Sequence, residues 1–391
     1  MRFRVLDSWR GILALLIALG HFEALWPGVN APLLRNGYLA VDFFFVLSGF
    51  VMAHAYGGRV SDGTSALSFM TRRLGRVWPL HAAVLGALLL AQVASFALGH
   101  SEAVFSPQFP LQGLLTNLVF LQVLGFHDAG TWNFPAWSIA IEFWTYLLFA
   151  FTSILRGGAL GFEALLLALA GGVAVAFLSP DFMSVYQGPP ALARCVFGFF
   201  VGVAIHVLVA RKGTPSASRA AMAELPVLAL ALVFIVFAGK SVWTMTAPLI
   251  FGGLVYIFSA EAGPVSRLLS SRPFLRIGAW SYSIYMVHAA ILFAVKDAAK
   301  AFERLTGIDV TVTARFGDGP RELLYLGGPY ATSGLVLVFL GLTIATAACT
   351  CRLIEDPGRR FFNRLAGSPS GRRARAVPVS PIRATAVLER R

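Results

Sequence analysis

The 391-residue sequence has little charge and almost no cysteine. Charged residues make up 13% of it, about half of the ~25% that is usual in a soluble domain. Its three cysteines have neither the spacing of a zinc site nor that of a disulfide framework, and no other cluster of metal ligands is evident, so we expect no bound metal. These shortages exclude a disulfide-stabilised scaffold and argue against an ordinary soluble enzyme.

Apolar residues, in contrast, are abundant, at 57% of the chain. Apolar runs of membrane-spanning length recur from end to end, which predicts an all-α, polytopic membrane helical bundle of about ten transmembrane helices. The expected spans are 9–27, 39–55, 77–98, 136–155, 160–178, 191–210, 223–238, 242–259, 279–297 and 332–352. The first run is long and lacks a small-residue cleavage site, so we expect it to be retained as a helix.

One further run, 111–126, is short and contains several polar residues, so we expect it to be re-entrant or interfacial. The N-terminus, alternate loops and the C-terminal tail then share one side with 24 basic residues, whereas the opposite loops hold six. If 111–126 crossed instead, every later loop would change sides. The positive-inside rule therefore favours ten spans with both termini cytoplasmic, in an inner or plasma membrane. This topology accounts for the net charge of +13 without nucleic acid.

The spans predict one transmembrane domain over residues 1–362. Residues 363–391 are rich in Arg, Pro and Ser, which is typical of a disordered basic cytoplasmic tail that can touch anionic lipid. Residues 298–331 form the only sizeable loop on the predicted outer side, and this loop could cover an outward-facing cavity.

Ionisable side chains inside spans cost about 2.5–3.5 kcal/mol each, so each of them requires a reason. Arg10 and His21 lie eleven residues apart in the first span, which separates them by about 16 Å along nearly one helix face. Asp42 and Glu142 fall in the outer halves of the second and fourth spans, at depths similar to that of His21. A histidine with a carboxylate partner can take a proton from a hydroxyl group.

Two further groups of polar residues stand out. The ninth span carries Tyr282, Ser283 and His288, with the histidine near mid-depth. At the inner end of the third span, Arg73 and Arg76 share a helix face, and paired guanidinium groups suit phosphate recognition. Together with the arginine at the inner end of the first span, they could hold a phosphate-bearing cytosolic ligand.

Several alternatives remain open for these residues. Arginines at inner helix ends are most often topology anchors, a membrane histidine can be a satisfied polar contact, and Asp42 could cap its helix. We expect Arg194, at the outer end of the sixth span, to be a snorkelling anchor. Ionisable residues in spans also suit a proton relay, as in a proton-coupled transporter or flippase for a lipid-linked sugar. A non-catalytic assembly protein is a third hypothesis.

Six segments in register resemble one known family. The stretch LDSWRGILALLIALGHF resembles the opening helix of the membrane acyltransferase-3 family, in which an arginine is followed eleven residues later by a histidine. Five more segments resemble this family in the expected order: VDFFFVLSGFVMA, RRLGRVWPLH, WSIAIEFWTYLL, SYSIYMVHAAIL and IEDPGRRFF. The resemblance covers residues 5–362, almost all of the chain outside the tail.

The resemblance implies an O-acyltransferase that moves an acyl group from cytosolic acyl-CoA, with no metal cofactor. The acceptor would be a hydroxyl group of an outward-facing carbohydrate, glycolipid or small molecule. Acetyl is the default expectation for the acyl group. The sequence specifies neither the acyl group nor the acceptor, and it leaves the oligomeric state open.

Three groups of site residues carry over from the family by position. The catalytic group is His21, Glu142 and Asp42. The acyl-CoA-binding group is Arg10, Arg73 and Arg76. The group without an assigned role is Tyr282, Ser283 and His288. We expect the histidine of the first group to act as general base, or alternatively to carry the acyl group covalently, and the acids to orient it.

Two departures from the family pattern matter. The segment after Trp137 and Ser138 carries one acid, Glu142, where the family has two adjacent acids, so a role that needs the second acid is unsupported. Some relatives also carry a fused extracellular hydrolase-like domain that completes the transfer. We expect the present chain to lack this domain and to act alone or with a partner protein.

Overall fold

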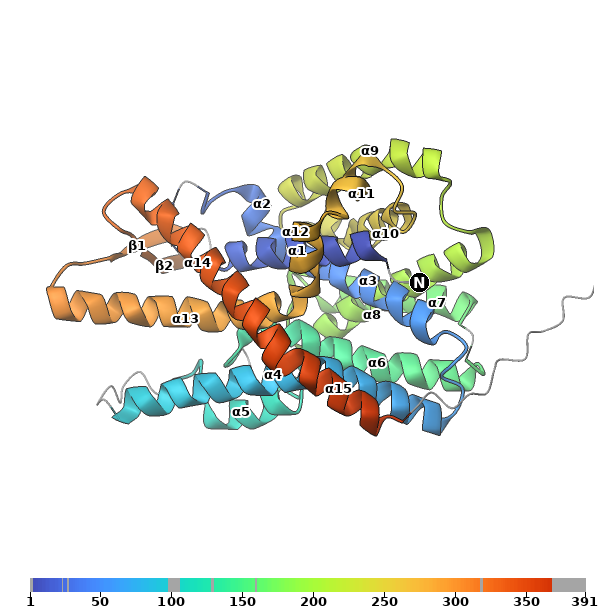
Figure 1. The fold of residues 1–391 in the computed structure, drawn as a ribbon, viewed down its shortest axis with the longest axis horizontal. Helices are drawn as coiled ribbons and strands as arrows, with labels where there is room; N and C mark the ends of the chain where they lie inside the picture. The colour runs from blue at the N-terminus through green and yellow to red at the C-terminus, as the bar shows by residue number, and fades with distance from the viewer. Residues whose placement is uncertain are drawn as a thin grey trace, which may run out of the picture.

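The computed structural model describes residues 3–22, 24–26, 28–97, 106–127, 130–158, 160–316 and 319–367. A helix lies in each of the ten ranges predicted to span the membrane (Figure 1). These helices are α1 (Arg4–Gly20), α3 (Ala40–Tyr56), α4 (Gly63–Ala97), α6 (Trp137–Leu155), α7 (Phe162–Leu178), α8 (Gly188–Lys212), α9 (Ala217–Phe237), α10 (Ala247–Phe258), α13 (Ser281–Thr306) and α14 (Pro329–Thr350). Helices satisfy their own backbone hydrogen bonds, which is why apolar runs fold this way in lipid.

The all-α, polytopic fold class is confirmed. Among the described residues, six helices are long and apolar enough to cross a membrane. The number is seven when α12 (Arg272–Ala279) and α13, which meet at a bend of 66°, count as one span. The count of ten spans remains a prediction. The run at 111–126 forms the helix α5 (Leu111–Leu118) followed by turns, and its eight residues cover about 12 Å of the ~30 Å hydrocarbon layer.

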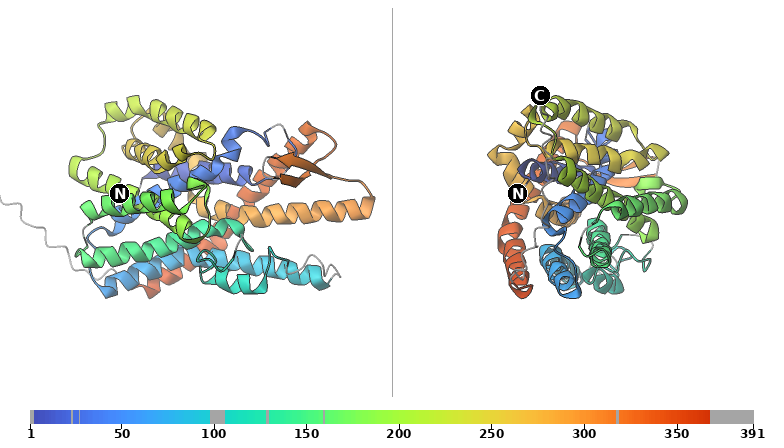
Figure 2. Two further views of the ribbon diagram at one scale, coloured as in Figure 1. Left: turned by 180° about the vertical axis from the view of Figure 1, so that it is seen from behind. Right: turned by 90° about the vertical axis from the view of Figure 1, so that its right-hand side faces the viewer.

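Short helices connect the long ones. They are α2 (Pro32–Arg35), η1 (Gly37–Leu39), η3 (Phe134–Ala136), η4 (Phe182–Ser184), η5 (Val242–Thr246), α11 (Pro264–Leu269), the π-helical η6 (Cys351–Glu355) and α15 (Asp356–Leu365). Helix α1 lies near the middle of the bundle in all views and packs against α12, α13 and α3 (Figure 2). Helix α1 is therefore surrounded by other helices, and its polar side chains can belong to sites inside the bundle.

Small residues let α3 and α8 approach each other closely. A Cβ atom on Gly49 of α3 would collide with the carbonyl oxygen of Phe199, and a Cβ on Gly202 of α8 would collide with that of Val46. Close contact of backbones at small residues is the usual way in which membrane helices associate. This crossing fixes the relative position of the polar side chains that the two helices carry.

The predicted outer loop contains a hairpin that the sequence analysis missed. Strands β1 (Thr311–Phe316) and β2 (Gly319–Leu324) pair antiparallel, with Thr311 opposite Leu324. The backbone N–H of Leu25, just after α1, donates to the carbonyl oxygen of Leu324 at 2.8 Å. The hairpin is thereby attached to the chain that leaves the outer end of α1.

The domain boundary predicted at residue 362 falls inside a helix, because α15 continues to Leu365. Residues 368–391 lie outside the described residues, so the predicted disordered tail remains a prediction.

Candidate active site

Two histidines from different helices form the centre of the site. His21 is the C-cap residue of α1, and His288 lies on α13, where it is fully buried. Their ring nitrogens, Nδ1 of His21 and Nε2 of His288, are 2.9 Å apart. The two rings are nearly parallel, with an interplanar angle of 6°. Both histidines were predicted site residues, but their contact with each other was not predicted.

The hydrogen bonds assign the protons of this pair. Nδ1 of His288 lies 2.8 Å from the carbonyl oxygen of Tyr285, which can only accept, so this nitrogen carries a proton. In neutral His288 the other nitrogen, Nε2, then accepts, and it accepts from Nδ1–H of His21. The remaining nitrogen of His21, Nε2, is left with a free lone pair. His21 is therefore arranged as a hydrogen-bond-oriented base.

The two carboxylates expected to orient His21 make their contacts elsewhere. Among the described residues, Glu142 accepts a hydrogen bond from the hydroxyl of Tyr146 at 2.8 Å, and both oxygens of Asp42 contact Arg194. The expected contact with His21 is made by His288 instead. The reason is packing, because α13 packs against α1 more extensively than α3 and α6, the helices that carry the acids.

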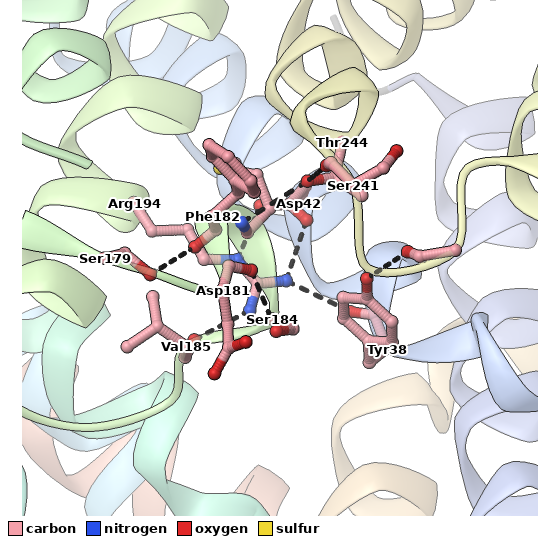
Figure 3. Close-up of polar contacts among 12 residues, drawn as sticks. Tyr38, Asp42, Ser179, Asp181, Phe182, Ser184, Val185, Arg194, Ser241 and Thr244 are labelled. Atoms are coloured by element: carbon pink, nitrogen blue, oxygen red, sulfur yellow. Dashed lines mark hydrogen bonds and ion pairs between the residues drawn. The ribbon is translucent and has the colours of Figure 1, made fainter. Parts of the chain in front are cut away.

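Arg194 and Asp42 form a fully buried ion pair between α8 and α3 (Figure 3). The guanidinium group donates from Nε and Nη2 to the two carboxylate oxygens at 2.9 and 2.7 Å. It also donates to the carbonyl oxygens of Val185 and Tyr38, and it lies over the ring of Trp137 at 5.5 Å. The prediction of a snorkelling anchor is wrong, because only 1% of Arg194 is exposed.

A small cavity beside Arg10, in the N-terminal half of α1, gathers the predicted donor-binding residues. Its volume is about 130 Å³, and Arg10, Arg73, Arg76, Glu142 and Tyr282 all contribute to its lining. The structure thus brings the three arginines from two helices to one place. We refer to this space as the inner cavity.

The three arginines differ in how their charge is compensated. Arg76 forms an ion pair with buried Glu355, which also accepts a hydrogen bond from Ser283 at 2.7 Å. The guanidinium group of Arg76 lies over the ring of Tyr282 at 5.2 Å, and the Tyr282 hydroxyl donates to the carbonyl oxygen of Val77. Ser283 and Tyr282 therefore support the Arg76 ion pair. Glu355 was not among the predicted site residues, although it lies in the segment IEDPGRRFF.

Arg73 and Arg10 have weaker contacts within the protein. Arg73 donates to the hydroxyl of Tyr56 at 3.2 Å, and its buried Nε has no hydrogen-bond partner among the described residues. Arg10 lies 3.8 Å from the carboxylate of Asp7. An unpaired N–H of a buried guanidinium group is costly, which points to an anionic ligand in the cavity.

One residue connects the inner cavity with the histidine pair. Tyr285 and Ser138 both line the cavity, and their hydroxyl groups are 2.8 Å apart. The backbone carbonyl of the same Tyr285 holds His288. Tyr285 therefore forms part of the cavity wall and also orients His288, the partner of His21.

A second and larger cavity, the outer cavity, lies at the other end of α1. Its volume is about 760 Å³, and Leu19, Gly20 and Phe22, the neighbours of His21 in the chain, line it. The two cavities therefore lie toward opposite ends of α1. His21 is not among the residues that line either of them, but its chain neighbours Gly20 and Phe22 line the outer one. Among the described residues, no group of three or more His, Cys, Asp or Glu side chains could hold a metal ion.

Comparison with known proteins identifies the class. Residues 3–352 match the acyltransferase-3 family, described as an acyltransferase domain. Together with the helical membrane fold, this match defines a multi-pass membrane enzyme that transfers acyl groups to hydroxyl oxygens. The chain belongs to the acyltransferase-3 family.

Three relatives illustrate the extent of the similarity. Acyltransferase MdmB of Streptomyces mycarofaciens is 24% identical over 84% of this chain and 82% of its own length. Protein 2 in the picA locus of Rhizobium radiobacter is 34% identical over 36% of this chain and 77% of its own. O-acetyltransferase OatA of Staphylococcus aureus is 26% identical over 75% of this chain, but the match spans about half, 51%, of OatA. No solved structure matches the chain.

Proposed function

We propose that this acyltransferase takes its acyl group from acyl-CoA on the cytoplasmic side and transfers it to a hydroxyl group on the outer side, with His21 as general base. The observation that carries the proposal is the hydrogen-bond chain from Tyr285 through His288 to His21, which leaves one imidazole nitrogen free to accept a proton. General-base catalysis by a positioned histidine is worth roughly 10²–10⁴-fold in rate.

The inner cavity is the proposed donor site. Its volume of about 130 Å³ is well below the roughly 300–1,000 Å³ of pockets that enclose drug-sized ligands. It can therefore hold the acyl end of the donor but not the whole of CoA, whose nucleotide would remain in the cytoplasm. Arg73 and Arg10, with their weakly compensated charges, are placed to contact the anionic part of the donor. Arg76 acts through its ion pair with Glu355 and shapes the cavity.

The transfer step balances as follows. The acceptor hydroxyl gives its proton to Nε2 of His21 while its oxygen bonds to the thioester carbonyl carbon. The C–S bond then breaks, and the CoA thiolate takes the proton from the imidazolium. His288 stabilises the imidazolium by accepting from Nδ1–H throughout. In this scheme Asp42 and Glu142 are positioning residues, because their contacts go to Arg194 and Tyr146.

The proposed topology and acceptor follow from the same arrangement. An acyl-CoA donor is cytosolic, so the end of α1 that carries Arg10 faces the cytoplasm, and both termini lie there in an inner or plasma membrane. The acetyl group is the proposed acyl group, since the related OatA is named an O-acetyltransferase. A carbohydrate or glycolipid hydroxyl is the proposed acceptor.

The test is to measure alkali-releasable acyl groups on surface glycans and lipids by mass spectrometry. Cells with the native chain are compared with cells that carry His21→Ala at equal membrane levels, with His54→Ala as the matched histidine control. We expect one ester to disappear in His21→Ala only, and its mass identifies the acyl group. Equal ester content in all three strains would refute the mechanism and favour a carrier that needs no CoA.

A further inference from the structure

The outer cavity has properties that neither the family membership nor the reaction explains. It lies at the end of α1 that carries His21, and its walls come from α2, η1, the end of α9 and β2. Its volume of about 760 Å³ lies within the range of roughly 300–1,000 Å³ that encloses a ligand the size of a drug or an oligosaccharide unit. This volume is about six times that of the inner cavity.

Hydrogen bonds between distant segments hold the walls of this cavity together. The side-chain amide of Asn36 donates to the carbonyl oxygens of Ile235 and Val236, and the hydroxyl of Tyr38 donates to that of Gly239 at 2.8 Å. On the opposite wall, Leu25 is bonded to the end of β2. The cavity is therefore a built feature of the fold, as expected of a largely pre-formed ligand site.

The charged residues that line the outer cavity all have the same sign. They are Arg35, Lys240 and Arg321, and the described lining contains no acidic residue. These three are half of the six basic residues in the predicted outer loops. Basic residues are disfavoured on the outer side by the positive-inside rule, so their collection around one cavity calls for an explanation. A cavity lined by one sign of charge concentrates ligands of the opposite sign.

An aromatic side chain completes the lining. Trp26 lines the cavity, and its buried indole N–H has no hydrogen-bond partner among the described residues. A Cβ atom on Gly28 would collide with the Trp26 ring, so glycine at this position allows the ring to pack as it does. An indole offers an apolar face for the C–H groups of a sugar and a donor for a hydroxyl group. The combination suits a sugar that carries an anionic group.

We propose that the outer cavity is the acceptor site and that the acceptor is a sugar carrying a phosphate or carboxylate group, bound by Arg35, Lys240 and Arg321. This inference rests on the proposed function, since the sugar hydroxyl is delivered to His21. The anionic group binds the three basic side chains, and the sugar ring lies against Trp26. The hydroxyl that reaches Nε2 of His21 receives the acyl group.

The experiment uses the full chain in phosphatidylcholine nanodiscs, which keep anionic headgroups away from the cavity. The probes are radiolabelled acetyl-CoA and a glycolipid extract of the host membrane, separated into neutral and anionic fractions by ion exchange. We expect His21-dependent label in the anionic fraction. Removing phosphates with mild acid, or reducing carboxylates with carbodiimide and borohydride, tells which anionic group is recognised.

The charge requirement is tested by a triple variant, Arg35→Gln, Lys240→Gln and Arg321→Gln. We expect its KM for the anionic acceptor to rise roughly tenfold or more with kcat unchanged, because exposed charges contribute modestly one by one and the three act together. The matched control is Arg211→Gln, Lys212→Gln and Arg219→Gln, three exposed basic residues away from the cavity. Trp26→Phe, which keeps the ring face but loses the N–H, should raise KM about threefold.

Three outcomes would overturn the inference. Label confined to the neutral fraction rejects an anionic acceptor while leaving the proposed function intact. An equal rise in KM in the control variant assigns the effect to overall charge rather than to the cavity. A complete absence of His21-dependent label in any fraction rejects the proposed function, and this inference with it.

Discussion

The two cavities along α1 differ in volume and in the charges of their linings. The inner cavity is small, and one of its three arginines, Arg76, is paired within the protein with Glu355, whereas Arg73 and Arg10 are weakly compensated. The outer cavity is large, and its described lining has three exposed basic residues and no acid. A small cavity suits one fixed chemical group. A large cavity whose charged lining residues have one sign suits a bigger ligand of the opposite charge.

Neither histidine is among the residues that line the two cavities, but chain neighbours of His21 line the outer one. His21 is at the outer end of α1, and Tyr285, which holds His288, lines the inner cavity. In the proposed function, an acceptor in the outer cavity and an acyl group in the inner cavity approach this base from two sides. The difference between the two cavities therefore predicts which variants change kcat or KM and which change only the stability of the protein.

The largest effect is expected at the base itself. Removing the acceptor for Nδ1–H of His21 with His288→Ala leaves the imidazole unoriented, so kcat should fall by about 10²-fold or more. His288→Gln provides a side-chain oxygen that can accept the same proton, so it should recover part of the loss. Acetyl transfer by purified protein is the measurement, with equal elution on size exclusion as the folding control. If both variants keep native kcat, His288 does not orient His21.

A large effect on stability is expected at the buried pair of Asp42 and Arg194. Asp42→Ala leaves the guanidinium group buried without its counter-ion, which should lower the free energy of unfolding by about 3–5 kcal/mol. The double variant Asp42→Leu with Arg194→Met removes both charges and should recover most of this loss. The midpoint of unfolding in a sodium dodecyl sulfate titration measures both. If the double variant is as unstable as the single one, the loss of stability does not come from the unpaired charge of Arg194.

These pairs also mark the limit of prediction from the sequence. Apolar runs identify the helices because a backbone in lipid must satisfy its own hydrogen bonds. Nine candidate site residues could also be named from motifs. The partners could not be named, because Asp42 and Arg194 are 152 residues apart, and His21 and His288 are 267 apart. Only the packing of helices decides which polar groups meet. The hairpin was missed although β1, TVTARF, alternates polar and apolar residues, because each strand has only six residues and β2, GPRELL, lacks this alternation.

Arg73 and Arg76 provide a matched comparison within the inner cavity. Arg73→Ala removes a weakly compensated charge, so KM for acetyl-CoA should rise about 10- to 100-fold with little change in unfolding. Arg76→Ala strands the buried carboxylate of Glu355, so it should mainly lower stability. Isothermal titration with CoA and the unfolding midpoint distinguish the two effects. The assignment is wrong if Arg73→Ala leaves CoA affinity unchanged in folded protein.

The smallest expected effect is at Tyr146, whose hydroxyl contacts both Glu142 at 2.8 Å and Ser48 at 3.0 Å. Tyr146→Phe keeps the ring but removes the donor to the carboxylate, which costs about 1–3 kcal/mol when a charged acceptor loses its bond. Because Glu142 lines the inner cavity and not the outer one, KM for acetyl-CoA should change severalfold while KM for the acceptor stays constant. Thr152→Val, which removes a hydroxyl from the same helix and lines neither cavity, is the control and should leave both constants near native values. A shift in the acceptor KM alone would contradict the assignment of the inner cavity to the donor and the outer cavity to the acceptor.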